Sequence, residues 1–188
     1  MSREQIRELG IGLEKSRCRF VWVIKDKKVD KEENQGLEEI LGDEFIERVK
    51  DRGLVMKNWV DQEEVLSHRS VSGFVSHCGW NSVSEAALLG VRMLAWPQGG
   101  DQKINAEVVR KCGLGMWVES WGWGGETVVK GEEIGERIRE MMGDEELRLR
   151  AMRVREEARK AVGVDGSSHT ALISFRQSLE CTGNPRLQ

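Results

Sequence analysis

The stretch VSGFVSHCGWNSVSEAALLG, residues 71–90, contains a short apolar strand, a polar turn and an Ala- and Leu-rich helix in succession. Gly79 permits a tight turn where the strand ends, and Gly90 is the type of residue that stops a helix. We therefore expect a strand at 71–77 and a helix at 79–89. A strand that leads into a helix is the repeating unit of α/β proteins.

The rest of the chain repeats this alternation. Apolar runs predict four further strands: RFVWVIK (19–25), LVMKNW (54–59), RMLAW (92–96) and LGMWV (114–118). Helices are expected at 2–16, where Ser2 and Gln5 have capping-box spacing, at 42–53, stopped by Gly53, at 62–68, and after Pro97 to about Cys112. A charged loop is expected at 26–36. This order predicts a Rossmann-like parallel sheet with helices on both faces, which binds ligands beyond the carboxyl ends of its strands.

Composition excludes several classes of function. The 188 residues carry a formal net charge of -3, so the chain has no general attraction for nucleic acid or for an anionic membrane. Its four cysteines lie far apart and lack metal-ligand spacing, which predicts reduced thiols in a cytoplasmic protein. No apolar run reaches the roughly 18 to 20 residues that a membrane helix needs.

The turn SHCGWNS, residues 76–82, has two interpretations. The first turn of the helix offers unpaired N–H groups and partial positive charge, which can hold a phosphate, and His77 stands immediately before it. Alternatively, Ser82 and Glu85 have capping-box spacing, and Asn81 is itself a good N-cap residue. The turn alone does not decide between an anion site and a helix cap.

The segment 59–102, WVDQEEVLSHRSVSGFVSHCGWNSVSEAALLGVRMLAWPQGGDQ, closely resembles the signature box of plant secondary-product UDP-glycosyltransferases of family 1. The elements that match are W-x-x-Q, HCGWNS with a Glu three residues on, AWP and the closing DQ. The resemblance implies the C-terminal, donor-binding half of a GT-B fold enzyme. It implies a donor domain at 1–170, without its first strand or the N-terminal acceptor domain, and an atypical tail at 171–188.

The resemblance also implies roles for residues around the nucleoside. Trp59 would stack on uracil, as a flat ring can do for about 1 to 3 kcal/mol. Gln62 would fix the base or ribose, and Glu85 would accept hydrogen bonds from the ribose hydroxyls. Val60 belongs to the same donor-binding set.

The diphosphate would lie at the turn itself. His77, Asn81 and Ser82 would hold it together with the backbone of Trp80, and Gly79 belongs to the same set. These residues lie at or beside the helix N-terminus, where partial positive charge favours an anion.

Asp101 and Gln102 resemble the pair that grips the sugar hydroxyls, and a closing Gln goes with glucose as the donor sugar. The chain has no DxD motif, so we expect UDP-glucose to bind without a metal or other cofactor. The helix terminus and His77 would then stabilise the leaving UDP during an inverting transfer.

No catalytic residue is expected within the chain. In the family, the general base is a histidine of the N-terminal domain, and neither His68, His77 nor His169 matches it. The function implied is transfer of glucose from UDP-glucose to a small phenolic plant metabolite such as a flavonoid. The alternative is a catalytically inactive nucleotide-sugar-binding fragment or interaction module.

Finer features concern the subgroup. The loop SWGWGGETVVKGEE, residues 120–133, and WVDQ are similar to plant enzymes that attach glucose to carbon atoms of flavonoid-type acceptors. Arg92 replaces the proline that most relatives have there. Trp121 and Trp123 either line the sugar site or pack on the domain surface, and we favour packing.

Overall fold

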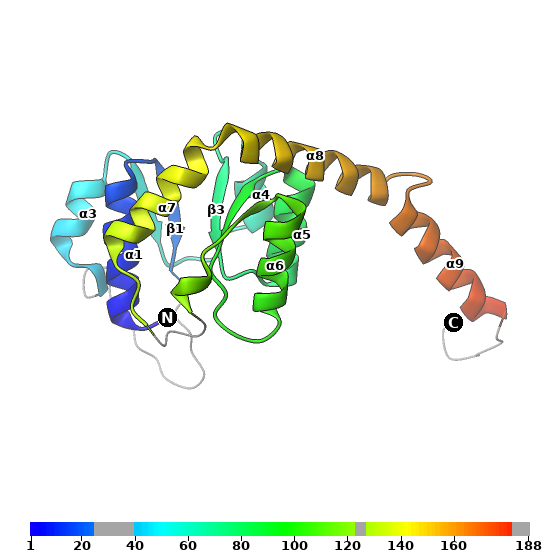
Figure 1. Ribbon diagram of the computed structural model, residues 1–188, viewed down its shortest axis with the longest axis horizontal. Helices are drawn as coiled ribbons and strands as arrows, with labels where there is room; N and C mark the ends of the chain where they lie inside the picture. The colour runs from blue at the N-terminus through cyan, green and yellow to red at the C-terminus, as the bar shows by residue number, and fades with distance from the viewer. Residues whose placement is uncertain (25–39, 123–126, 182–188) are drawn as a thin grey trace.

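The computed structural model describes residues 1–24, 40–122 and 127–181 (Figure 1). Five strands lie in this part of the chain: β1 (Phe20–Val23), β2 (Gly53–Met56), β3 (Gly73–Ser76), β4 (Arg92–Ala95) and β5 (Gly115–Trp117). The N-terminal helices are α1 (Arg3–Ser16), α3 (Asp43–Val49), α4 (Gln62–Ser67), α5 (Trp80–Leu89) and α6 (Gln102–Cys112). A short 3-10 helix, η1 (Glu119–Trp121), precedes α7 (Gly131–Gly143), α8 (Glu145–Val162) and α9 (Ser167–Cys181). The loop expected at 26–36 lies outside the described residues.

The strands form two parallel sheets, in the orders β1-β2 and β3-β4-β5. Phe20 pairs with Gly53, Gly73 with Arg92, and Met93 with Gly115. Every residue of β4 is buried, as expected for the middle strand of a covered sheet. The predicted α/β fold is confirmed, although the described strands are hydrogen-bonded as two sheets.

Two clusters of buried side chains hold the domain together. One joins β4 to α5, α6 and α8 through residues such as Met93, Ala106 and Ala151. The other joins α1, β4, α7 and α8 through residues such as Leu9, Leu94 and Ile134. Helices therefore lie on both faces of the β3-β4-β5 sheet, while α8 runs across the domain and α9 extends away from its body (Figure 1).

Helices α1 and α7 pack closely because glycines face each other. A Cβ atom at Gly12 would lie 2.6 Å from Ile134 Cγ2, and one at Gly131 would lie 2.5 Å from Ile11 Cγ2. A side chain at either position would collide with an isoleucine of the other helix. Gly12 and Gly131 thus set the short distance between the helices.

Two local expectations were wrong. Ser2 Oγ accepts the N–H of Gln5 at 3.1 Å, but the Gln5 side chain does not complete a capping box. It is buried and hydrogen-bonds both backbone groups of Val129, because tertiary contact with the loop before α7 competes with the local cap. Gly53 does not stop α3, which ends at Val49; it is the first residue of β2.

Helix α9 exposes apolar side chains, among them Leu172, Ile173 and Phe175. The domain boundary expected at residue 170 falls within this helix. The division into a donor domain and a tail stays a prediction.

Candidate functional site

The predicted site residues all follow the carboxyl ends of strands. Trp59 and Val60 come after β2, and Gln62 is the first residue of α4. The residues after β3 are His77 and Gly79, followed in α5 by Trp80, Asn81, Ser82 and Glu85. Asp101 and Gln102 come after β4, at the start of α6. This is the edge at which parallel α/β sheets bind ligands.

The N-terminus of α5 is not capped by a side chain. Gly79 occupies the N-cap position and makes no side-chain cap bond, so the first-turn N–H groups are available to a ligand. Asn81 and Ser82 are the second and third residues of the helix, so neither is its N-cap. The capping-box interpretation of Ser82 and Glu85 is therefore wrong, and it fails because the helix begins earlier than a cap at Ser82 requires.

Cys78 shapes the turn that leads into α5. Its φ of +65° lies in the left-handed region, which is unusual for a residue with a side chain. The thiol is fully buried, and burial raises its pKa to about 11. Cys78 therefore stays a protonated thiol at neutral pH, and its contribution is to the shape of the turn.

The His77 side chain lies over Gly79. A Cβ atom at Gly79 would stand 2.8 Å from His77 Nε2, so a larger residue there would displace the ring. Glycine at position 79 thus allows the exposed His77 imidazole to lie against the start of α5.

Gln62 connects α4 to α5. Its Nε2 donates hydrogen bonds to Ser82 Oγ at 3.1 Å and to Glu85 Oε2 at 2.7 Å. The Gln62 amide therefore orients the Glu85 carboxylate. Contact of Glu85 with a ribose stays a prediction from the sequence.

A second network connects the β3 turn to α6 through Asn105, which sequence reasoning missed. Asn105 Nδ2 donates to the Cys78 carbonyl oxygen at 3.0 Å and to Asp101 Oδ2 at 3.0 Å. Asn105 is only 6% exposed and stands beside the buried Ala106. A polar residue on the buried face of this helix, one turn after Asp101, was the signal that could have identified it.

Gln102 is held by its own loop. Its Oε1 accepts the N–H groups of Gln98 at 2.8 Å and Gly99 at 3.0 Å. The two N–H groups of Gln102 Nε2 are then the part of the side chain suited to donate to a ligand.

The tryptophans considered for the site differ in their exposure. Trp59 is 76% exposed and Trp80 is 55% exposed, both at the sheet edge described above. Trp121 is buried, packs on Trp96 with ring centroids 4.5 Å apart, and donates from Nε1 to Glu133. The packing interpretation of Trp121 is therefore confirmed, and Trp123 lies outside the described residues.

Arg92 has a structural role. Its guanidinium donates to the backbone carbonyls of Ser72, Met141 and Met142 at 2.9 to 3.1 Å. These bonds connect the strand region to the carbonyl end of α7, where a cation is favourable. Burial lowers the pKa of Arg92, although a guanidinium remains charged at neutral pH.

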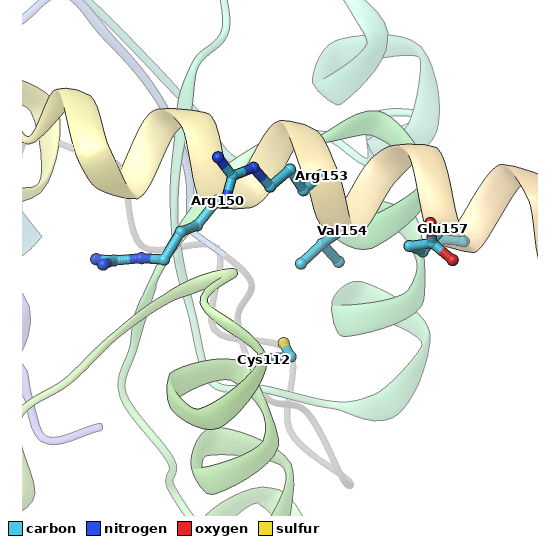
Figure 2. Close-up of a pocket in the computed structure, with 6 residues that line it drawn as sticks. Cys112, Arg150, Arg153, Val154 and Glu157 are labelled. Atoms are coloured by element: carbon cyan, nitrogen blue, oxygen red, sulfur yellow. The ribbon is translucent and has the colours of Figure 1, made fainter.

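A shallow hollow between the end of α6 and α8 is separate from this site. Cys112, Arg150, Arg153, Val154, Glu157 and Ala158 line it (Figure 2). It lies at the carboxyl end of α6, whereas Asp101 and Gln102 lie at the amino end, and the two share no residue.

Within 1–24, 40–122 and 127–181, no three His, Cys, Asp or Glu side chains gather as metal ligands would. In the same part of the chain, no helix combines the length and the apolar character needed to span a membrane.

Comparison with known proteins identifies the family. A family model for UDP-glucoronosyl and UDP-glucosyl transferases matches residues 1–146. The chain is 56% identical over 184 residues to UDP-glycosyltransferase 708G2 of Citrus unshiu, a match that covers 98% of this chain and 39% of the relative. It is 54% identical over 176 residues to UDP-glycosyltransferase CGT of Oryza sativa subsp. indica, which covers 93% of this chain and 37% of the relative. The chain thus spans less than half of the length of these curated relatives.

The fold matches as well. The crystal structure of LpCGTa in complex with UDP aligns with a TM-score of 0.84 at 49% identity, over 93% of this chain and 38% of that one. With its parallel strands between helices, the domain has the Rossmann-like architecture of the C-terminal half of a GT-B enzyme. The chain belongs to the family of UDP-glucoronosyl and UDP-glucosyl transferases.

Proposed function

We propose that this chain is the donor-binding half of a UDP-glucose-dependent glycosyltransferase. The observation that carries the proposal is the start of α5, which has no side-chain cap and lies between two hydrogen-bonded networks. One network, Gln62 with Ser82 and Glu85, offers a carboxylate to ribose hydroxyls. The other network, in which Asn105 donates to the Cys78 carbonyl and to Asp101, connects the turn before α5 to Asp101, the residue that we assign to the sugar.

The nucleoside would stack on Trp59, whose exposed ring has room for a base. The diphosphate would lie against the N–H groups of Trp80, Asn81 and Ser82, with His77 beside it. In such an arrangement negative charge on the leaving UDP meets the positive end of α5 without a metal ion.

The sugar end is complementary to a diol. Asp101 Oδ2 is occupied by Asn105, which leaves Oδ1 to accept from a hydroxyl, while Gln102 Nε2 donates to one. An acceptor and a donor side by side suit two neighbouring hydroxyls of glucose, because a hydroxyl can do both.

Calorimetric titration of the chain with UDP and UDP-glucose tests this assignment. Trp59→Ala should weaken the binding of both ligands by about 1 to 3 kcal/mol, because stacking is lost. Trp59→Phe should retain part of that binding energy. Gln102→Glu keeps an oxygen that accepts the loop N–H groups but removes the Nε2 donor. It should therefore lower the affinity for UDP-glucose and leave the affinity for UDP unchanged. Equal UDP affinity in Trp59→Ala would count against the stacking role, and added EDTA should alter neither affinity.

For the acceptor, we infer a phenolic metabolite of the flavonoid type that receives glucose at carbon. The similarity of WVDQ and SWGWGGETVVKGEE to plant enzymes of that kind supports it. A longer protein that contains this chain should give a product that resists acid hydrolysis, since a carbon–carbon bond is not cleaved as a glycosidic oxygen bond is. An acid-labile glucoside would contradict the inference.

A further inference from the structure

The Gln102 side chain, which we assign to the sugar, is oriented by the loop that precedes it. The backbone N–H groups of Gln98 and Gly99 both donate to Gln102 Oε1, at 2.8 and 3.0 Å. Because a backbone N–H can only donate, the atom of the amide that faces this loop must be the oxygen. The loop therefore decides on which side of the amide the Nε2 hydrogen-bond donor lies.

The loop from Gln98 to Gln102 is a turn that closes on itself. Gln102 N–H donates to the Gly99 carbonyl at 3.3 Å, in the opposite direction to the bond from Gly99 N–H to the Gln102 side chain. Gly100, in the middle of the turn, is exposed and has a φ of +62°, which glycine adopts without strain. An exposed turn of this kind is mobile unless something outside it holds its first residues.

The Gln98 side chain holds the start of the turn. Its Nε2 donates to the Trp96 carbonyl at 3.2 Å and to the Pro97 carbonyl at 3.3 Å. Trp96 is a firm attachment point, because it is buried, its N–H donates to the Ser76 carbonyl at 2.8 Å, and its ring packs on Trp121. The Gln98 amide thus connects the turn to the buried end of β4.

These contacts also separate Gln98 from the ligand. An amide nitrogen has two hydrogens, and the carbonyls of Trp96 and Pro97 provide an acceptor for each of those on Gln98 Nε2. The backbone N–H of Gln98 is bonded to Gln102. The donors of Gln98 therefore all serve the loop, and what they arrange is the Gln102 side chain.

We propose that Gln98 is a positioning residue for the sugar of the nucleotide-sugar donor. It fixes the turn whose N–H groups orient the Gln102 amide, and so it places the Gln102 Nε2 donor opposite a sugar hydroxyl. The inference rests on the proposed function, which assigns Gln102 to the sugar. Loss of the Gln98 side chain releases the turn and misplaces that donor, while the nucleotide contacts at α5 remain.

Gln98→Leu tests this role in the 188-residue chain. Leucine removes the Nε2 donor without adding charge, so the ratio of UDP-glucose affinity to UDP affinity should fall by about two- to tenfold, the effect of roughly one neutral hydrogen bond. The affinity for UDP itself should not change. Gln177→Leu, at an exposed position of α9, is the matched control and should change neither affinity. Gln98→Met also lacks the donor and provides the same test should the leucine variant fail to fold.

A double-mutant cycle distinguishes positioning from direct contact with the sugar. Gln102→Ala removes the group that Gln98 orients, so adding Gln98→Leu to that variant should lower the affinity ratio no further. If the two losses add, Gln98 acts on the sugar independently of Gln102, and the positioning role is overturned.

Amide hydrogen exchange, followed by NMR without any ligand, tests the same connection. The Gly99 N–H should exchange at least about twofold faster in Gln102→Ala, which lacks its acceptor, and in Gln98→Leu, in which the turn is released. The Asn105 N–H, bonded within the first turn of α6, should keep its rate and show that the helix is intact. An unchanged Gly99 rate in Gln98→Leu would overturn the inference.

The outcomes keep this inference apart from the proposed function. If Gln102→Ala lowers the affinity ratio but Gln98→Leu does not, only the positioning role is contradicted. If Gln102→Ala leaves the ratio unchanged, the assignment of Gln102 to the sugar fails, and the inference fails with it. If the chain binds neither UDP nor UDP-glucose, the proposed function is contradicted, and exchange at Gly99 still decides whether Gln98 orients Gln102.

Discussion

Gln62 Nε2 donates a hydrogen bond to Glu85 Oε2 across 2.7 Å, and this bond joins the first residue of α4 to the second turn of α5. Because the two helices follow different strands, the bond fixes the Glu85 carboxylate relative to the base-binding side of the site. The Gln62 amide therefore positions Glu85 for the ribose in the proposed function.

Removing that amide should weaken the binding of all uridine ligands. In Gln62→Ala we expect the affinities for uridine, UDP and UDP-glucose to fall by a similar factor. A hydrogen bond to a charged group, such as the one from Gln62 to Glu85, contributes about 1.5 to 3 kcal/mol. Glu63→Ala, at the exposed neighbouring position, is the control. If calorimetry finds a lower melting temperature but an unchanged affinity for uridine in Gln62→Ala, then Gln62 stabilises the fold and does not contribute to ligand binding.

Asn105→Ala should affect both stability and the sugar end of the site. The Cys78 carbonyl is left without its side-chain donor and Asp101 without its partner, so we expect a loss of about 1 to 3 kcal/mol in the free energy of unfolding. The ratio of UDP-glucose to UDP affinity should also fall, because Asp101 loses its orientation.

Ile104→Ala, at a position that is 71% exposed on the same helix, should change neither quantity. Urea denaturation and paired titrations provide the comparison. An unchanged affinity ratio in Asn105→Ala would show that Asn105 acts on folding alone.

Arg92→Met should destabilise the fold without altering nucleotide affinity. The substitution removes charged donors from the Ser72, Met141 and Met142 carbonyls, and we expect a cost of at least about 1.5 to 3 kcal/mol. Arg153→Met, on the exposed face of α8, is the matched control. Its free energy of unfolding should stay within about 0.5 kcal/mol of that of the unaltered chain. Chemical denaturation that finds equal stability for the two variants would contradict the role assigned to Arg92.

The 188-residue chain, expressed alone, should transfer no glucose. Loss of a general base typically reduces the rate of catalysis by about 10² to 10⁴-fold. None of the three histidines of this chain matches the histidine that is expected to act as the base. His68 caps α4, His169 lies in α9, and His77 stands at the proposed diphosphate. Release of UDP that depends on an added flavonoid acceptor, measured with the purified chain, would refute this prediction.

Local patterns predicted most of the helices and strands because each has a strong start or stop signal. Gly90 ends α5 in the left-handed conformation, and Ser2 caps α1, as the sequence indicated. Two failures concern helix ends: α3 ends before Gly53, and α5 begins earlier than a cap at Ser82 requires.

The other failures came from contacts between distant residues. Gln5 bonds Val129, a pairing that leaves no trace in the local pattern. Asn105 stands out as a polar residue on the buried face of α6, but the local pattern does not indicate that its partner is Cys78. Hydrogen bonding of the described strands as two sheets was likewise not predictable from strand propensity, because pairing depends on strands far apart in sequence.

A comparison of UDP with uridine, on the unaltered chain and on His77→Ala, tests the proposed diphosphate site most directly. If the diphosphate binds at the start of α5, the unaltered chain should bind UDP more tightly than uridine. His77→Ala should then weaken UDP at least about tenfold, or 1.4 kcal/mol, while uridine affinity stays the same. Equal affinity of the unaltered chain for UDP and uridine, or an equal loss of both ligands in His77→Ala, would contradict a diphosphate site at this helix.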